Sequence, residues 1–157
     1  EQDLGAGEAA GAMATTQLTR LVREVVAAML PLFESQSRRI HVDVAEAVRC
    51  KGDKSLLQTA IGNVLENAFH HGQGDVSIAL RADGEEIRLT VADEGPGVPP
   101  ERQEAMFIRF NKGVPGSKGA GLGLAITRTV LRNCGGEVRF VQSANCVLEL
   151  RLQPAPA

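Results

Sequence analysis

The 157-residue chain contains no tryptophan and no tyrosine, and aromatic residues make up only 3% of it. Proteins that hold single-stranded nucleic acid usually stack its bases on aromatic side chains, so this kind of binding is not expected here. The formal net charge is −2 and no long basic run is present, which argues against a surface for duplex DNA or RNA. The composition therefore predicts no nucleic-acid partner.

Cysteine and long apolar runs are also scarce. The three cysteines, Cys50, Cys134 and Cys146, are odd in number and follow no metal-binding spacing, which favours buried thiols in a reducing compartment. No signal peptide and no apolar run of membrane-spanning length is found. With 43% apolar residues, the chain has enough material for one globular domain with its own core.

The first 50 residues are predicted to contain one helix and two short strands. Apolar residues recur at helical spacing over residues 18–33, where Pro31 should kink the helix or weaken its last turns. Residues 40–44 alternate as a strand, and residues 47–50 are expected to be its short hairpin partner.

Two hairpins and two helices are predicted in the second half. Asp83-Gly84 is a strong turn signal between the alternating runs 76–80 and 87–91, and a last hairpin joins residues 138–140 to residues 148–152. The helices begin at Pro99-Pro100 and at Leu122, and Gly135-Gly136 ends the second one.

Helices and adjacent hairpins in this order predict an α+β fold, a two-layer sandwich. Its helices should pack on one face of a mixed, mostly antiparallel sheet. The domain is assigned to residues 16–153, with residues 1–15 as a tail or linker and residues 154–157 as an unstructured tail.

A helix from the N-cap Asp53 to about His71 carries a pair of polar residues, Asn63 and Asn67. Four residues apart on a helix, their side chains are neighbours, roughly 5–6 Å apart at Cβ. Magnesium takes oxygen ligands, and an amide oxygen can ligate it without adding negative charge beside a triphosphate. The alternative is that both are surface or capping asparagines.

The run Asp93-Glu94-Gly95-Pro96-Gly97 follows a strand whose alternate residues are apolar. A carboxylate at this place can accept a hydrogen bond from an exocyclic amine such as that of adenine. Gly95 and Gly97 would let the backbone approach a flat ligand closely. The alternative is a solvated turn.

The run from Gly119 to Leu124 places three glycines at the start of a helix, where free amides and the helix dipole suit phosphate oxygens. It is not a P-loop, and no βαβ unit precedes it to support a dinucleotide fold. Arg109, Lys112 and Lys118 could meet phosphate charge in the segment before it, or form a solvated loop. The nearby Phe107 and Phe110 could anchor a lid or belong to the core.

The three histidines do not have metal spacing with any cysteine. His41 is expected to point outward from a strand. His70 and His71 end a helix, where a cation suits the dipole.

Each of these features is weak alone, but their order and spacing together resemble the catalytic ATP-binding domain of sensor histidine kinases, in the GHKL ATPase group. Residues 63–67 are similar to the family's asparagine box, and residues 93–97 to its first glycine box. Residues 107–110 are similar to its phenylalanine box, and residues 119–124 to its second glycine box. The resemblance covers roughly residues 18–152.

The resemblance implies a role for each box. Asn67 binds Mg²⁺, with Asn63 as a second residue of the metal site that assists at the phosphates. Asp93 reads adenine, Gly95 and Gly97 make room for it, and the segment from Phe107 to Gly119 forms a lid. The remaining implied ATP contacts are His70, His71, Phe110, Lys112, Lys118, Gly119, Gly121, Leu122 and Gly123.

Two departures from the family pattern affect these roles. His70 stands where the family often has lysine, so its contact with phosphate is weak when the ring is neutral. The lid is short, and the dimerisation helices, with a histidine followed by an acidic residue and a proline, are absent. The chain therefore resembles half of a kinase.

The implied function is to bind ATP-Mg²⁺ and donate the γ-phosphoryl group to a histidine on a dimerisation domain, in two-component signalling with a response regulator downstream. The full-length protein would be a homodimeric inner-membrane sensor with this portion in the cytoplasm. Hydrolysing members such as gyrase and the heat-shock chaperone carry glutamate where Asn63 stands, which argues against steady hydrolysis. Two alternatives stay open: an anti-sigma-factor serine kinase, whose pattern His71 resembles, and a nucleotide-binding interaction module without transfer activity.

Overall fold

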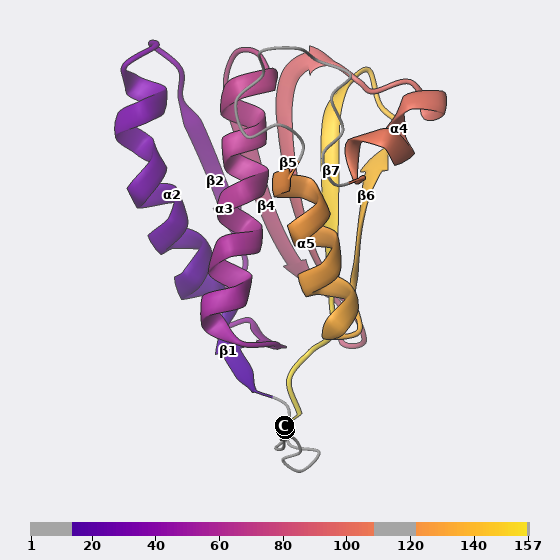
Figure 1. Ribbon diagram of the computed structural model, residues 1–157. Coiled ribbons are helices and arrows are strands. Elements are labelled where there is room, and N and C mark those ends of the chain that lie inside the picture. The colour runs from indigo at the N-terminus through magenta and orange to yellow at the C-terminus, as the bar shows by residue number, and fades with distance from the viewer. Residues whose placement is uncertain (1–13, 109–121, 157) are drawn as a thin grey trace.

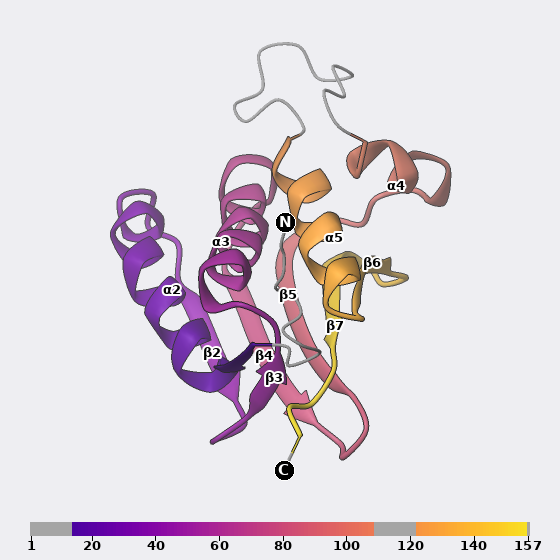
Figure 2. The same cartoon turned by 60° about the horizontal axis from the view of Figure 1, so that its bottom comes forward.

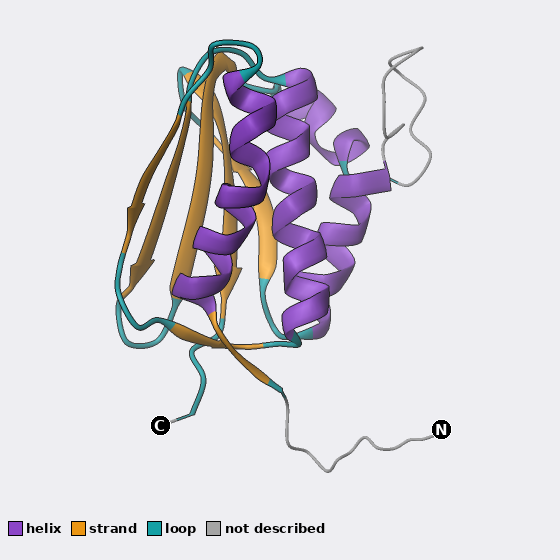
Figure 3. Cartoon of the chain, turned by 90° about the vertical axis from the view of Figure 1, so that its left-hand side faces the viewer, coloured by secondary structure: helices purple, strands orange, loops and turns teal. Residues whose placement is uncertain are grey.

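The computed structural model of the chain describes residues 14–108 and 122–156. It has two layers, a five-stranded sheet and a layer of helices on one face of that sheet (Figures 1 and 3). This confirms the predicted α+β sandwich. The sheet order is β2 (Ile40–Val44), β4 (Val76–Ala82), β5 (Ile87–Pro96), β7 (Asn145–Leu152) and β6 (Glu137–Val141).

All neighbouring strands of this sheet are antiparallel except β2 and β4, which pair in parallel with Val42 opposite Ile78. The turn at Asp83 joins β4 to β5, and the carbonyl of Glu86 accepts from the Asp83 amide at 3.1 Å. The prediction of a hairpin at Asp83-Gly84 is therefore confirmed.

Among the described residues, three long helices lie side by side across the sheet: α2 (Leu18–Glu34), α3 (Lys54–His71) and α5 (Leu122–Asn133). A short helix, α4 (Pro100–Met106), lies beyond them (Figure 2). The Asp53 carboxylate caps α3 by accepting from the Leu56 amide at 3.1 Å. The helix α2 continues through Pro31, and at the end of α5 the positive φ of +83° at Gly135 suits a glycine.

The core fills the space between the layers. It is formed by alternate residues of the central strands and by one apolar face of each long helix. Its fully buried large side chains include Phe33, Leu65, Leu80, Leu89 and Leu150. Within the described ranges, no helix is long and apolar enough to cross a membrane.

The expected hairpin between residues 40–44 and 47–50 is wrong. Strand β3 (Arg49–Lys51) pairs instead with β1 (Thr15–Gln17) in a separate two-stranded sheet. The start of α2 holds the intervening turn away from β2, because the Thr19 hydroxyl donates to the Ala45 carbonyl at 2.7 Å and accepts from the Val48 amide at 3.0 Å.

Strand β3 also binds the end of the chain. The Lys51 amide donates to the Gln153 carbonyl at 2.9 Å, and the Ala155 amide donates to the Arg49 carbonyl at 3.0 Å. The prediction of an unstructured tail from Pro154 onward is therefore wrong for Pro154 and Ala155, which backbone pairing holds against β3.

Candidate functional site

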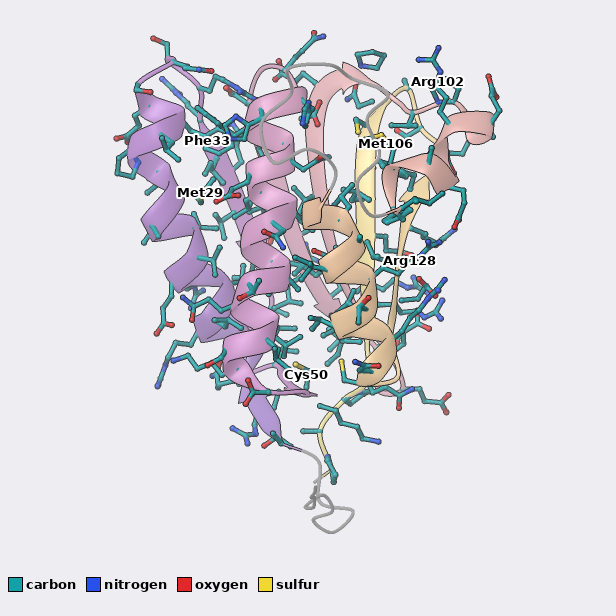
Figure 4. The ribbon with its side chains drawn as sticks, in the orientation of Figure 1. Met29, Phe33, Cys50, Arg102, Met106 and Arg128 are labelled. Carbon is teal, nitrogen blue, oxygen red and sulfur yellow. The ribbon has the colours of Figure 1, made fainter. Side chains whose placement is uncertain are left out.

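The described site residues gather toward the end of the molecule at which α3 and β5 end, the upper end in Figure 1. Phe33 lies between α2 and α3 at this end, and Cys50 lies at the opposite end (Figure 4). Segments that are distant in sequence meet at this end, because β5 pairs with the antiparallel strand β7 and the connection from α3 to β4 lies beside them.

Asp93 lies within β5 rather than after it, because the strand continues to Pro96. Its side chain is buried, with 5% exposure. The carboxylate oxygen Oδ1 accepts from the Gly95 amide at 2.7 Å and from the Gln73 amide at 3.3 Å. The alternative of a solvated turn is therefore wrong: the carboxylate is enclosed and held in one orientation.

Cys146 lies directly opposite Asp93 on β7. Burial, and then the charge and hydrogen bonding of Asp93, raise the pKa of the Cys146 thiol to about 11. The thiol is therefore protonated at neutral pH and can donate to the carboxylate. Sequence reasoning missed this residue, because only strand pairing places it beside Asp93.

The connection from α3 to β4, residues 72–75, packs directly against the carboxylate. A Cβ on Gly72 would come within 2.5 Å of Asp93 Oδ2, and a Cβ on Gly95 would come within 2.9 Å of Oδ1. Gly72 is therefore required by a close approach, which sequence reasoning also missed. The Glu94 amide donates to the Gln73 carbonyl at 2.8 Å and fixes the connection on β5.

Asn63 and Gly123 are brought together where α3 packs on α5. The Asn63 side-chain amide donates to the Gly123 carbonyl at 3.2 Å, and a Cβ on Gly123 would lie 3.4 Å from Asn63 Cβ. The buried Thr127 hydroxyl strengthens the contact by donating to the Ala60 carbonyl at 2.9 Å. The half-buried Asn63 is therefore no surface asparagine but joins two helices.

Asn67 lies one turn after Asn63 on α3 and is half-buried. The hydrogen bonds found among the described residues include none from its side chain, so its amide oxygen is available as a ligand. Those residues also contain no group of three His, Cys, Asp or Glu side chains that could hold a metal ion. A cation at this place would therefore depend on amide oxygens and on oxygens of a ligand.

His70 and His71 are exposed at the end of α3, and their rings are 6.4 Å apart between centroids. Partial burial, with a smaller effect of the charge of His70, holds the pKa of His71 below its usual value and so favours its neutral form. His41 is exposed on β2, and its Nε2 lies 3.0 Å from Asp75 Oδ2.

Phe107 belongs to the core, as the second of its two interpretations predicted. Its ring lies 5.4 Å from that of Phe140 between centroids, and the Arg128 guanidinium lies 4.6 Å from its centroid. Arg128 also makes two hydrogen bonds of 2.8 Å to Glu104, which ties α5 to α4.

Several predicted contacts lie outside the described residues: Phe110, Lys112, Lys118, Gly119 and Gly121, together with the side chain of Leu122.

Comparison with known proteins identifies relatives of this arrangement. Residues 52–156 match the family described as histidine kinase-, DNA gyrase B- and HSP90-like ATPases. The chain is 33% identical to the sensor-like histidine kinase SenX3 of Mycobacterium tuberculosis over 133 residues, which cover 81% of this chain and 32% of that protein.

Two solved structures are similar over most of the chain. The mycobacterial sensor histidine kinase MprB has a TM-score of 0.78 and 26% identity, over 93% of this chain and 100% of that one. Full-length ShkA, solved in complex with AMPPNP, has a TM-score of 0.75 and 28% identity, over 93% of this chain and 32% of that one.

The chain thus spans about a third or less of the length of the curated relatives that it matches. The family match covers more than half of the chain, and it includes Asn63, Asn67, Asp93 and Gly123. The chain therefore belongs to the histidine kinase-, DNA gyrase B- and HSP90-like ATPase family, and within it to the catalytic ATP-binding domains of sensor histidine kinases.

Proposed function

We propose that the chain binds ATP with Mg²⁺ and donates the γ-phosphoryl group to a histidine on a separate dimerisation domain, as one part of a two-component signalling protein. The observation that carries the proposal is the carboxylate of Asp93, which is buried and held by backbone amides. Gly72 packs so closely against it that a Cβ would come within 2.5 Å of Oδ2. A response regulator is the expected downstream partner. The full-length protein is expected to be a homodimeric sensor whose ATP-consuming part lies in the cytoplasm.

Asp93 supplies the base-reading group. Both backbone amides that hold the carboxylate donate to Oδ1, so we assign Oδ2, the oxygen that Gly72 approaches, as the acceptor for the exocyclic amine of adenine. Guanine carries an oxygen at the corresponding position, so two acceptors would face each other. Gly95 lies against this carboxylate without a side chain, which supports the close approach of a flat base, whereas a Cβ on Gly97 would meet the carbonyls of Ser143 and Asn145.

Asn67 and Asn63 suit the metal-bound phosphates. The free amide oxygen of Asn67 would hold Mg²⁺, and Asn63 would stabilise the start of α5, whose first amides suit phosphate oxygens. When bound, Mg²⁺ neutralises charge on the phosphates and lowers the barrier to phosphoryl transfer. Because Asn63 is an amide and cannot act as a general base, the site is not expected to activate water.

The phosphoryl acceptor is expected to come from another polypeptide segment. His41 lies on β2 and pairs with Asp75, while His70 and His71 end the helix that carries the proposed metal ligands. Transfer requires an acceptor in line with the γ-phosphate, and a histidine fixed at the end of α3 is placed as a contact residue instead.

The test mixes this chain with γ-labelled ATP, with and without the dimerisation domain of the same kinase. The isolated chain should bind ATP-Mg²⁺ but neither label itself nor release phosphate at an appreciable rate. The added domain should gain acid-labile, base-stable label, slowly because the two parts are not tethered. Stoichiometric label on this chain would refute the proposal. Label on a serine of an added partner would favour an anti-sigma-factor kinase, and binding without any transfer would favour an interaction module.

A further inference from the structure

The segment that braces Asp93 has no regular structure of its own. Residues 72–75 leave α3 and enter β4, and Gln73 contributes both an amide to Asp93 and a carbonyl to the Glu94 amide. The position of the carboxylate therefore depends on whatever fixes this connection. A displacement of the connection would move the acceptor that faces the base.

Arg38, in the turn between α2 and β2, joins the last turn of α3 to the connection. Its Nη1 donates to the Phe69 carbonyl at 2.9 Å, its Nη2 to the Ala68 carbonyl at 3.1 Å, and its Nε to the Gly74 carbonyl at 2.7 Å. The last carbonyls of a helix have no partner within the helix, and the guanidinium supplies one to Phe69, while the Ala68 carbonyl also accepts from the Gly72 amide at 3.0 Å. The third hydrogen bond reaches past the helix and holds Gly74, one residue beyond Gln73.

The guanidinium is itself held in place. It lies 5.0 Å from the ring centroid of Phe33 and 5.6 Å from that of Phe69, and these two rings are 5.2 Å apart in an edge-to-face arrangement. Phe33 is fully buried, so the stack is anchored in the core. A planar fork that stacks on aromatic rings and carries a permanent charge is specific to arginine, and the positive charge also suits the C-terminal end of a helix.

We propose that Arg38 is a positioning residue for base recognition: it holds the connection of residues 72–75 so that Gln73 keeps the Asp93 carboxylate in its reading orientation. The proposal rests on the proposed ATP-binding function and adds a residue that does not touch the nucleotide. Lysine cannot replace it, because one ammonium group cannot stack on two rings while it reaches three carbonyls in fixed directions.

The test measures the affinities of the wild-type chain, Arg38→Lys and Arg38→Met for ATP and for GTP by calorimetry. The ratio of the two affinities is the readout, because a loss of folded protein lowers both affinities equally and leaves the ratio unchanged. The wild-type chain should prefer ATP, and both variants should lose about fivefold or more of that preference, as expected for one misplaced hydrogen-bonding group. The matched control is Arg81→Met, which removes another arginine that donates to a carbonyl, that of Asp43 at 2.9 Å, on β2. It should keep the wild-type ratio.

Hydrogen exchange is the second measurement. It tests whether Arg38 positions Gln73 even if Arg38→Met does not fold. In Arg38→Lys the Gln73 amide should exchange faster than in the wild-type chain, while amides in the β4–β5 pairing should be unchanged. An unchanged Gln73 amide, or an unchanged ATP-to-GTP ratio in a folded variant, overturns the role of Arg38 alone. A wild-type chain without any preference for ATP refutes base reading by Asp93, and the role of Arg38 with it.

Discussion

The two oxygens of Asp93 make different contacts: Oδ1 accepts from two backbone amides, and Oδ2 is the proposed acceptor for the adenine amine. Two substitutions should separate the effects of these contacts on stability and on ATP affinity. Asp93→Ala removes both, whereas Asp93→Asn keeps one acceptor for the Gly95 and Gln73 amides and places an NH₂ group where the base amine should bind. The alanine variant should therefore lose both stability and ATP affinity. The asparagine variant should lose mainly affinity.

The magnitudes follow from the contacts. The Gly95 amide is buried and its bond to Oδ1 is 2.7 Å long, so its loss in Asp93→Ala should cost about 1–3 kcal/mol. The Gln73 bond is longer, 3.3 Å, and lies partly exposed, so it should add about 1 kcal/mol or less. In Asp93→Asn both bonds survive with a neutral acceptor, at a cost of about 1 kcal/mol. In both variants, ATP affinity should fall by about 1–3 kcal/mol, about fivefold to 150-fold.

Chemical denaturation followed at one wavelength, together with calorimetry for ATP and GTP, measures both quantities on the same samples. The expected order of stability is wild type, then Asp93→Asn, then Asp93→Ala. Equal stability of the alanine variant and the wild-type chain would show that the two amides do not depend on Oδ1. Undiminished preference of Asp93→Asn for ATP over GTP would place the base pocket elsewhere.

Two further predictions concern the metal and the buried thiols. Asn67→Ala should weaken ATP binding strongly when Mg²⁺ is present and little when it is chelated, as calorimetry under both conditions can show; equal losses would make Asn67 a structural residue. Burial and, to a smaller extent, the charge of Cys134 raise the pKa of Cys50 from 9.0 to about 12. Between these two values the native state keeps a proton that the unfolded chain gives up. Stability should therefore fall as the pH rises above about 9, and Cys50→Ala should show a shallower fall in denaturation experiments; identical slopes would contradict this.

Local signals in the sequence predicted much of the framework, because they act over a few residues. The Asp53 cap, the turn at Asp83-Gly84 and the glycine after α5 each satisfy or permit a backbone geometry within about one turn of their own position. The α+β class also follows from element order, whereas only the family resemblance brought Asn63 and Gly123 into one site. Of the predicted site, local signals placed Asn63 and Asn67 on a helix and Gly123 at a helix start, but they placed Asp93 after its strand instead of within it.

Pairings between distant segments could not be read in the same way. Strand β2 is short and alternates like a hairpin strand, yet it pairs in parallel with β4 across the whole of α3, and β3 pairs with β1. Arg38 and Cys146 show the same limitation at the site. In the sequence, Arg38 is a basic residue in a turn, and Cys146 is a residue of an ordinary strand. Their partners are defined only when the chain has folded.

The small strand β3 holds the first and last described segments of the chain side by side. On one side it pairs with β1, and the Gly52 amide donates to the Ala14 carbonyl at 2.7 Å; on the other side it binds residues 153–155. Both segments therefore leave the domain at the end opposite Asp93 (Figure 1). A short linker between them should allow circular permutation, with new termini in the exposed turn at residues 83–86, because this changes the connectivity and leaves every backbone pairing of β3 in place.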